Sequence, residues 1–127
     1  MVRQKLYKPV RINELTQLVF KGVTMNFKEL SKNLGLEEEE YSELFELFVE
    51  TGMADLNELW IAIDMANAEK AARIAHSLKG AALNLGLNEF HELAETIGKT
   101  ARDGQLEKIA QIAKTLHEKL DTVAGLV

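Results

Sequence analysis

The sequence predicts an all-α protein, built as an antiparallel four-helix bundle with short N-terminal capping helices. Three observations support this prediction. Ala, Leu, Glu and Lys dominate the 127 residues, and the single proline, Pro9, lies near the N-terminus. Four long segments repeat apolar residues at spacings of three and four, as a helix with one buried face does. Short connections containing glycine or asparagine separate the segments, which favours antiparallel neighbours.

Residues 1–24 are expected to form a tail and a short helix, with the bundle in residues 25–127. Residues 1–10 show no clear period. From Ile12 onward, apolar residues recur at helical spacing: Ile12, Leu15, Leu18 and Val19. Gly22 would end this short helix. Asn26 is a suitable N-cap for a second short helix, which Gly35 would end.

A long helix is expected to begin at the four acids Glu37–Glu40, because carboxylates favour a helix N-terminus. Its buried stripe would include Tyr41, Leu44 and Phe45 and continue to Ile63. Gly52 interrupts the stripe, so this segment is either one long helix or two helices in line. Asn67 is expected to be a break in the helix or a cap, since it precedes the next apolar repeat.

Three further helices complete the expected bundle. One runs from about Glu69 to Leu85 and ends at Gly86, and the next runs from Asn88 to about Arg102 and ends at Gly104. The last begins near Gln105 and keeps its apolar period as far as Val123. Together with residues 37–63, these segments give the four helices of the bundle.

Composition and charge exclude several classes of function. The chain has no cysteine, which excludes disulfides and thiolate metal sites and fits a reducing compartment. Residues 33–127 carry eight Lys/Arg against eighteen Asp/Glu, so nucleic acid is not an expected partner. Residues 1–32 carry seven Lys/Arg against two Glu, and we expect this basic stretch to lie against the acidic body. No apolar run is long enough for a membrane span, and no secretory signal is recognised, so we expect a cytoplasmic protein.

The segment that carries chemistry is Ala75–Gly86. The apolar residues of the helix that contains this segment form one stripe: Ala71, Ile74, Ala75, Leu78, Ala82 and Leu85. At about 100° per residue, His76 falls about 155° from the centre of that stripe and is expected to face solvent. A helical side chain leans over the preceding turn, so residue 80 would cover the imidazole. Residue 80 is glycine, which costs about 1 kcal/mol in a helix relative to alanine but leaves His76 uncovered.

The neighbours of His76 suit a phosphorylated imidazole. Lys79 also leans back toward His76, and its ammonium group suits a phosphoryl group that carries about −1.5 to −2 charges. Histidine itself forms covalent intermediates and is largely neutral at cytoplasmic pH. Ala72 and Leu83 lie on the same exposed face, and we expect them to form a docking surface together with Gly80.

These residues resemble a known family. The run Ala75-His76-Ser77-Leu78-Lys79-Gly80-Ala81-Ala82, followed by Leu85-Gly86, is similar to the signature of histidine-containing phosphotransfer domains of two-component phosphorelays. The resemblance covers about residues 27–123. It implies that His76 is the phosphoacceptor, that Lys79 stabilises the phosphoryl group and that Gly80 makes room for a partner's active site.

The resemblance also implies partners. They would be a response-regulator receiver domain, a hybrid histidine kinase, or both, and the protein would be a phosphocarrier rather than an enzyme. No cofactor is expected on the bundle; magnesium is expected only in the partner receiver domain. Members of this family place a polar side chain near the phosphohistidine from the following helix. The corresponding place here is near Gly98, and Lys99 and Arg102 are the candidates to replace that side chain.

Alternative functions predict different sequence features. A metal site is not expected, because the three histidines lie on three different predicted helices, and we interpret His91 and His117 as ordinary boundary residues. A dimerising histidine kinase domain would usually have an acidic residue after the histidine, where this chain has Ser77. The remaining alternative is a helical interaction module whose His76 is never phosphorylated. The presence of His76, Lys79 and Gly80 together favours the phosphocarrier.

Overall fold

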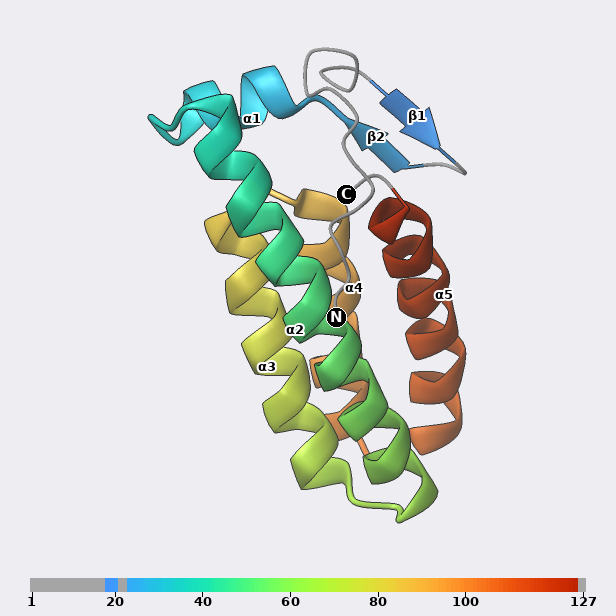
Figure 1. Ribbon diagram of the computed structural model, residues 1–127. Helices are drawn as coiled ribbons and strands as arrows, with labels where there is room; N and C mark the ends of the chain where they lie inside the picture. Colours follow the sequence, from blue (N-terminus) through green and yellow to red (C-terminus); the bar gives the residue numbers. More distant parts are fainter. Residues whose placement is uncertain (1–17, 21–22, 126–127) are drawn as a thin grey trace.

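The computed structural model describes residues 18–20 and 23–125, and the side chains of residues 26–125. Two short strands are followed by five helices (Figure 1). Their bounds are β1 Leu18–Phe20, β2 Val23–Met25, α1 Phe27–Asn33, α2 Glu38–Asp64, α3 Ala68–Asn84, α4 Asn88–Arg102 and α5 Leu106–Ala124.

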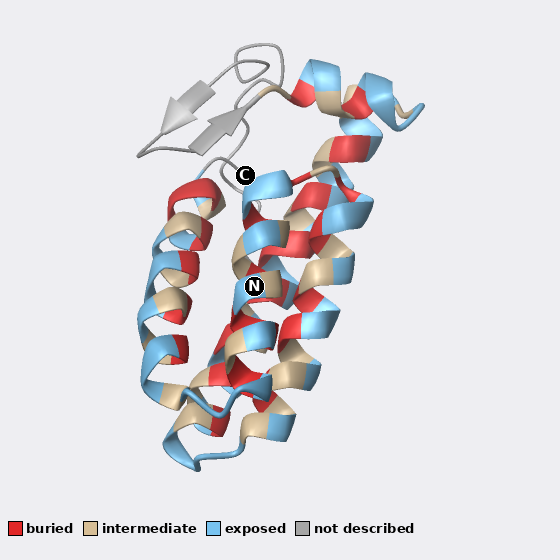
Figure 2. Ribbon diagram, turned by 180° about the vertical axis from the view of Figure 1, so that it is seen from behind, coloured by how far each residue is buried: buried red, intermediate tan, exposed pale blue. Residues whose placement is uncertain are grey.

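The long helices α2 to α5 form a helical bundle, as the sequence predicts. α3 packs against α2 and α4, and α5 packs against the same two helices, so each helix has two neighbours. Their buried faces point into the bundle and their exposed faces point outward (Figure 2). Across residues 18–20 and 23–125, no helix is long and apolar enough to cross a membrane.

The N-terminal region differs from the prediction. Residues 18–20 form β1 rather than the end of a helix, and β1 pairs with β2 in antiparallel register, with Phe20 opposite Val23. β-branched and aromatic residues favour strands, and a connection of two residues is typical of a hairpin. Among residues 18–20 and 23–37, which the structure describes, the one helix before α2 is α1. The expected tail and the rest of the expected first helix lie outside the described residues.

Local capping bonds explain where the helices begin. The side-chain oxygen of Asn26 accepts a hydrogen bond from the backbone N–H of Glu29 at 3.1 Å, and that of Asn67 accepts one from Lys70 at 3.0 Å. At the start of α2, the backbone N–H of Glu37 donates to the carboxylate of Glu40 at 2.9 Å. The run of four acids is thus a helix start, and the described residues contain no group of acids and histidines suited to a metal ion.

The helix ends also follow the sequence. Gly86 and Gly104, which follow α3 and α4, have φ angles of 72° and 75°. This left-handed conformation is easily adopted by glycine and stops a helix. Connections of three residues then lead from α2 to α3, from α3 to α4 and from α4 to α5. Short connections of this kind keep consecutive helices side by side.

Gly52 lies inside one continuous helix. α2 runs through it without a break, and Gly52 is buried. A Cβ atom built at this position would lie 3.0 Å from Cδ2 of Leu120 on α5. The glycine therefore permits the close approach of α2 and α5, a tertiary reason that the apolar period of α2 does not reveal.

Tyr41 joins the first turn of α2 to the end of α3. Its side chain is fully buried, and its hydroxyl donates a hydrogen bond to the backbone carbonyl of Leu85 at 2.7 Å. Burial raises the pKa of the Tyr41 phenol. Phe27 of α1 packs on this region, with its ring centroid 5.7 Å from that of Tyr41 and 5.1 Å from that of Phe45. α1 therefore covers the end of the bundle where α3 stops.

Candidate functional site

The orientation of α3 places His76 on the surface. Small and apolar side chains on the opposite face are buried against the neighbouring helices: Ala71, Ala75, Leu78 and Ala82. His76 and Gly80 are exposed, and Ala72 is half-buried beside them. The helical period had predicted this orientation, and the structure confirms it.

Gly80 leaves an open space over its face of α3. A Cβ atom built at Gly80 would meet no atom within 4 Å, and the residue is exposed. Close helix packing therefore does not explain this glycine. The open space lies one turn after His76, where a longer side chain would lean back over the imidazole.

Lys79 and Leu83 complete the exposed face of α3 that was predicted from the sequence. Lys79 is half-buried, and no ion pair holds its ammonium group within the described part of the chain. The side chain of Leu83 is 57% exposed, a large exposed fraction for an apolar residue among the described ones. The lysine thus keeps its hydrogen-bond donors available, while the leucine offers apolar surface next to Gly80.

A groove between α3 and α4 contains His76. It is lined by Ala68, Glu69, Ala72, Arg73, His76, Ala101 and Arg102. Of these, only His76 and Ala72 were predicted as site residues, with Arg102 as a candidate on the following helix. Glu69 and Arg73 were missed, although the spacing of residues 69, 72, 73 and 76 places them on one face of a helix. That face could be found from the sequence, but its apposition to α4 could not.

The local charge near His76 is opposite to that of the protein as a whole. The chain carries a formal net charge of −5. Around His76, however, Arg73 and Arg102 line the groove and Lys79 follows on α3, while Glu69 is the one acid in the lining. This distribution favours an anion near the imidazole.

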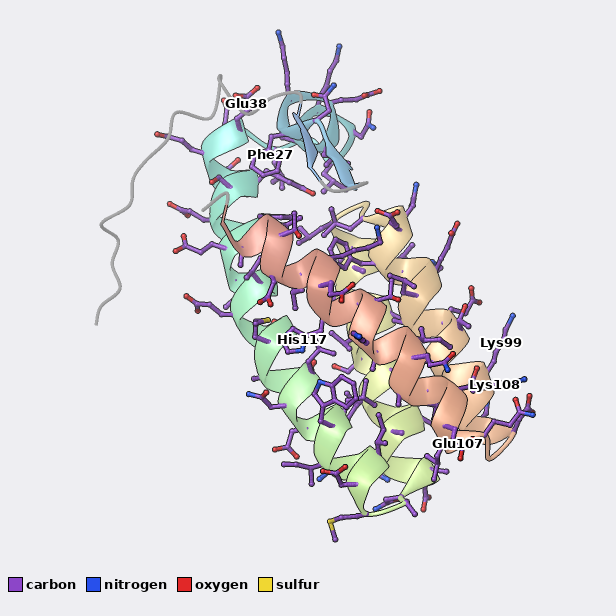
Figure 3. All side chains as sticks on the ribbon, turned by 90° about the vertical axis from the view of Figure 1, so that its right-hand side faces the viewer. Phe27, Glu38, Lys99, Glu107, Lys108 and His117 are labelled. Carbon is purple, nitrogen blue, oxygen red and sulfur yellow. The ribbon has the colours of Figure 1, made fainter. Side chains whose placement is uncertain are left out.

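Gly98, where the family pattern would place a polar side chain, is buried between α3 and α4. A Cβ atom built there would lie 3.7 Å from Cβ of Ala75 and 3.6 Å from Nη1 of Arg102. The guanidinium group of Arg102 therefore extends back over Gly98. Lys99, the other candidate, is exposed and extends away from the helices (Figure 3).

The other two histidines have different surroundings. Nδ1 of His117 accepts a hydrogen bond from Nε1 of Trp60 at 3.4 Å, and its Nε2 lies 3.7 Å from a carboxylate oxygen of Asp121. Figure 3 shows His117 on α5 beside α2. His91 is half-buried on α4 and is not among the residues lining the His76 groove. Both positions agree with the interpretation of these histidines as boundary residues.

A second groove, which the sequence did not indicate, is mostly apolar. It lies between the α1–α2 connection, α2 and α3, and its lining includes Leu34, Leu44, Leu47 and Ala81. Leu44 is 43% exposed and Leu47 is 54% exposed. The sequence predicts apolar surface at Leu83 and places Leu44 in the buried stripe of α2. The prediction for Leu44 is wrong, because the edge of that stripe depends on tertiary packing.

Fold and exposed histidine together define a class of protein: a helical bundle that presents a histidine on one outer helix face. The family model of the Hpt domain matches residues 43–125, well over half of the chain. The chain therefore belongs to the Hpt domain family. Such domains act in histidine phosphotransfer of two-component systems, as phosphocarriers rather than enzymes. Searches of curated proteins and of solved structures gave no match.

Proposed function

We propose that this protein accepts a phosphoryl group on His76 and passes it to or from an aspartate of a response-regulator receiver domain. The observation that carries the proposal is the uncovered imidazole of His76 on a helix inside the region matched by the Hpt family. The proposal includes an antiparallel arrangement of α2–α5 as the phosphotransfer bundle. The three-residue connections and the pairwise packing of these helices support it.

The transfer would exchange one bond to phosphorus for another. A neutral imidazole nitrogen of His76 attacks the phosphorus of an aspartyl phosphate, and the N–P bond forms as the bond to the aspartyl oxygen breaks. The aspartate leaves as a carboxylate, and the reverse step returns the phosphoryl group. Positioning and charge stabilisation supply most of the catalysis in such a reaction.

The other residues on this face assist the transfer. Lys79 would donate hydrogen bonds to the phosphoryl oxygens, and charge-assisted bonds of this kind are strong. Gly80 would leave room for the receiver's active site, and Ala72 and Leu83 would contact the receiver around it. The receiver would supply the aspartate and the magnesium ion. A hybrid histidine kinase is a further expected partner, and the bundle would need no cofactor.

The first prediction tests the phosphoacceptor. We expect His76→Gln to abolish labelling by phosphorylated receiver domains in the presence of magnesium, because glutamine lacks the nucleophilic nitrogen. The side chain is exposed, so the fold should be retained, as circular dichroism would verify. His91→Gln is the matched control, because His91 lies on another helix outside the groove; it should be labelled like the wild type.

The chemistry of the label and the choice of donor make this test decisive. The label should be acid-labile and base-stable, as expected for a phosphohistidine. Equal labelling of the wild type and His76→Gln would refute the assignment of His76. If no receiver from a broad panel labels the wild type, the interaction-only module becomes the better interpretation.

A further inference from the structure

The apolar groove between the α1–α2 connection, α2 and α3 gathers much of the exposed apolar surface of the described residues. Six large apolar side chains are strongly exposed in that part of the chain, and three of them line this groove: Leu34, Leu44 and Leu47. The groove has a volume of about 520 Å³, which is within the range of sites that bind a ligand or a segment of chain. Apolar surface that is gathered in one groove, rather than scattered, indicates a site that another segment covers.

Negative charge surrounds this groove. α2, which forms one of its walls, carries nine acidic residues and no basic one. Glu40 and Glu43 are exposed, each one turn before a leucine of the groove, Leu44 and Leu47 respectively. The last turn of α1 contributes one cation, Lys32. The groove therefore suits an occupant that combines apolar side chains with positive charge, unlike the basic groove around His76.

The N-terminal segment of the chain has this composition. Four of residues 2–12 are basic and none is acidic: Arg3, Lys5, Lys8 and Arg11. Five others have large apolar or aromatic side chains: Val2, Leu6, Tyr7, Val10 and Ile12. The segment thus combines the two properties that the groove selects.

The segment is also tethered near the groove. The described chain begins at Leu18, and β2 leads directly into α1 at the end of the bundle where α2 begins (Figure 1). The groove lies at the same end, since its lining includes Leu34 after α1 and Leu85 after α3. At about 3.3 Å per residue, the connection from Ile12 to Leu18 spans roughly 20 Å, enough to cross two helices packed about 8–10 Å apart. A short tether of this kind gives a local concentration on the order of millimolar.

We propose that residues 2–12 dock in this groove, with their apolar side chains between α2 and α3 and their basic side chains beside Glu40 and Glu43. Docking there has a consequence for the transfer site, because Ala81 lines the groove and directly follows Gly80. A docked segment and a receiver placed over Gly80 would compete for this part of α3. The N-terminal segment is then an internal competitor of the receiver, and this consequence rests on the proposed function.

The first test locates the segment in the full chain. The chain has no cysteine, so a spin label attached at Gln4→Cys is the only label. We expect it to broaden the backbone NMR signals of Leu44, Leu47 and Ala81 at low ionic strength. The broadening should weaken in about 1 M salt, where the Debye length falls to about 3 Å. The same label at Gln111→Cys, an exposed position on α5, should leave these signals sharp.

Substitutions on either side of the contact should weaken it. In the chain labelled at residue 4, Lys5→Glu/Lys8→Glu and Leu47→Lys should each sharpen the signals of the groove, and the exposure of Leu47 should preserve the fold. Ile61→Lys is the matched control, because Ile61 is 44% exposed on α2 and does not line the groove. It should leave the broadening unchanged.

Three results would overturn the inference. The first is the absence of broadening in the groove. The second is broadening around Ile61 as strong as around Leu44, because the basic segment would then be attracted to α2 as a whole. The third comes from a mixed sample, in which one copy carries the spin label and another the observed nuclei. Broadening there as strong as within one chain would show that the segment docks on a second copy.

Phosphotransfer measures the competition. From a sub-saturating phosphorylated receiver, Lys5→Glu/Lys8→Glu should take up the phosphoryl group about fivefold faster than the wild type, as expected if the surface is free in about one wild-type chain in five. Lys108→Glu/Lys114→Glu, at exposed positions on α5, changes the net charge equally and should match the wild type. Phosphoramidate, a small donor that needs no docking surface, should phosphorylate all three chains on His76 at the same rate.

The outcomes for the inference and for the proposed function differ. Equal uptake from the receiver by the wild type and Lys5→Glu/Lys8→Glu would overturn the competition. A wild type that neither donor phosphorylates would contradict the proposed function, whereas the NMR measurement would still decide whether the segment docks in the groove.

Discussion

The two faces of α3 near His76 have different roles: one packs against neighbouring helices, and the other is accessible from solvent. Alanines at positions 71, 75 and 82 are buried and let neighbouring helices approach, whereas His76 and Gly80 face outward. A glycine within a helix lowers the stability of the protein relative to alanine. Gly80 has open space around it, so packing does not offset this loss. The compensation must lie outside the folded monomer, which is the argument for a partner that approaches this turn.

Gly80→Gln tests this argument. Glutamine is the better helix former, so we expect the free energy of unfolding to stay equal or rise by up to about 1 kcal/mol. Transfer from a receiver should slow by about 100-fold, the order caused by a misplacement of about 1 Å at the reacting centre. Chemical denaturation and single-turnover transfer measure the two quantities.

Thr115→Gln is the control for Gly80→Gln, because Thr115 is an exposed position on α5. It should change neither stability nor transfer. Normal transfer by Gly80→Gln would contradict the assignment of Gly80 to partner access, whatever its effect on stability.

At the scale of the elements, local sequence patterns predict the four long helices correctly but predict a helix where residues 18–20 form β1. The end of α4 at Arg102 and the cap of α3 at Asn67 follow from capping residues and glycine, whose effects act over a single turn. The sequence predicts a helix that includes residues 18–20, because a few apolar residues match the helical period. In so short a segment the same residues also suit a strand, and strand pairing decided between the two.

Gly52 illustrates what the period of one helix cannot reveal. The sequence leaves open whether residues 37–63 form one helix or two. A glycine can lie within a helix at some cost in stability, or it can separate two helices. The deciding contact is with Leu120, which is far away in the sequence. The same limit explains why Arg73 and Glu69 were missed in the groove, since the groove exists only where α3 and α4 lie together.

Gly52→Leu should therefore destabilise the protein. A new Cβ atom would lie 3.0 Å from Cδ2 of Leu120, and the rest of the leucine would force α2 and α5 apart. We expect a loss of about 2 kcal/mol in the free energy of unfolding, as overpacked cores show. Ala54→Leu, at an exposed position on α2, should change it by less than about 0.5 kcal/mol. Equal stability of Gly52→Leu and wild type in urea would show that the contact is not tight.

At the scale of the whole molecule, an acidic protein carries a local basic site. The net charge of −5 keeps other anions at a distance, whereas Arg73, Lys79 and Arg102 favour one near His76. The acidic balance of residues 33–127 and the lysine of the motif can be predicted from the sequence. The way in which charges from α3 and α4 combine cannot, because it depends on the packing of the two helices.

The boundary between the N-terminal region and the bundle, placed after residue 24, remains a prediction that deletion can test. The core of the described residues begins at Phe27. A chain lacking residues 1–24 should therefore unfold cooperatively, with a midpoint within a few degrees of the full chain, and should still be phosphorylated on His76. A chain lacking residues 1–34 would lose Phe27 from its contact with Tyr41 and Phe45, and should be less stable by about 3–5 kcal/mol. Thermal unfolding followed by circular dichroism compares the three chains. If removal of residues 1–24 alone causes the larger loss, the boundary is wrong, and the hairpin of β1 and β2 belongs to the folding unit of the bundle.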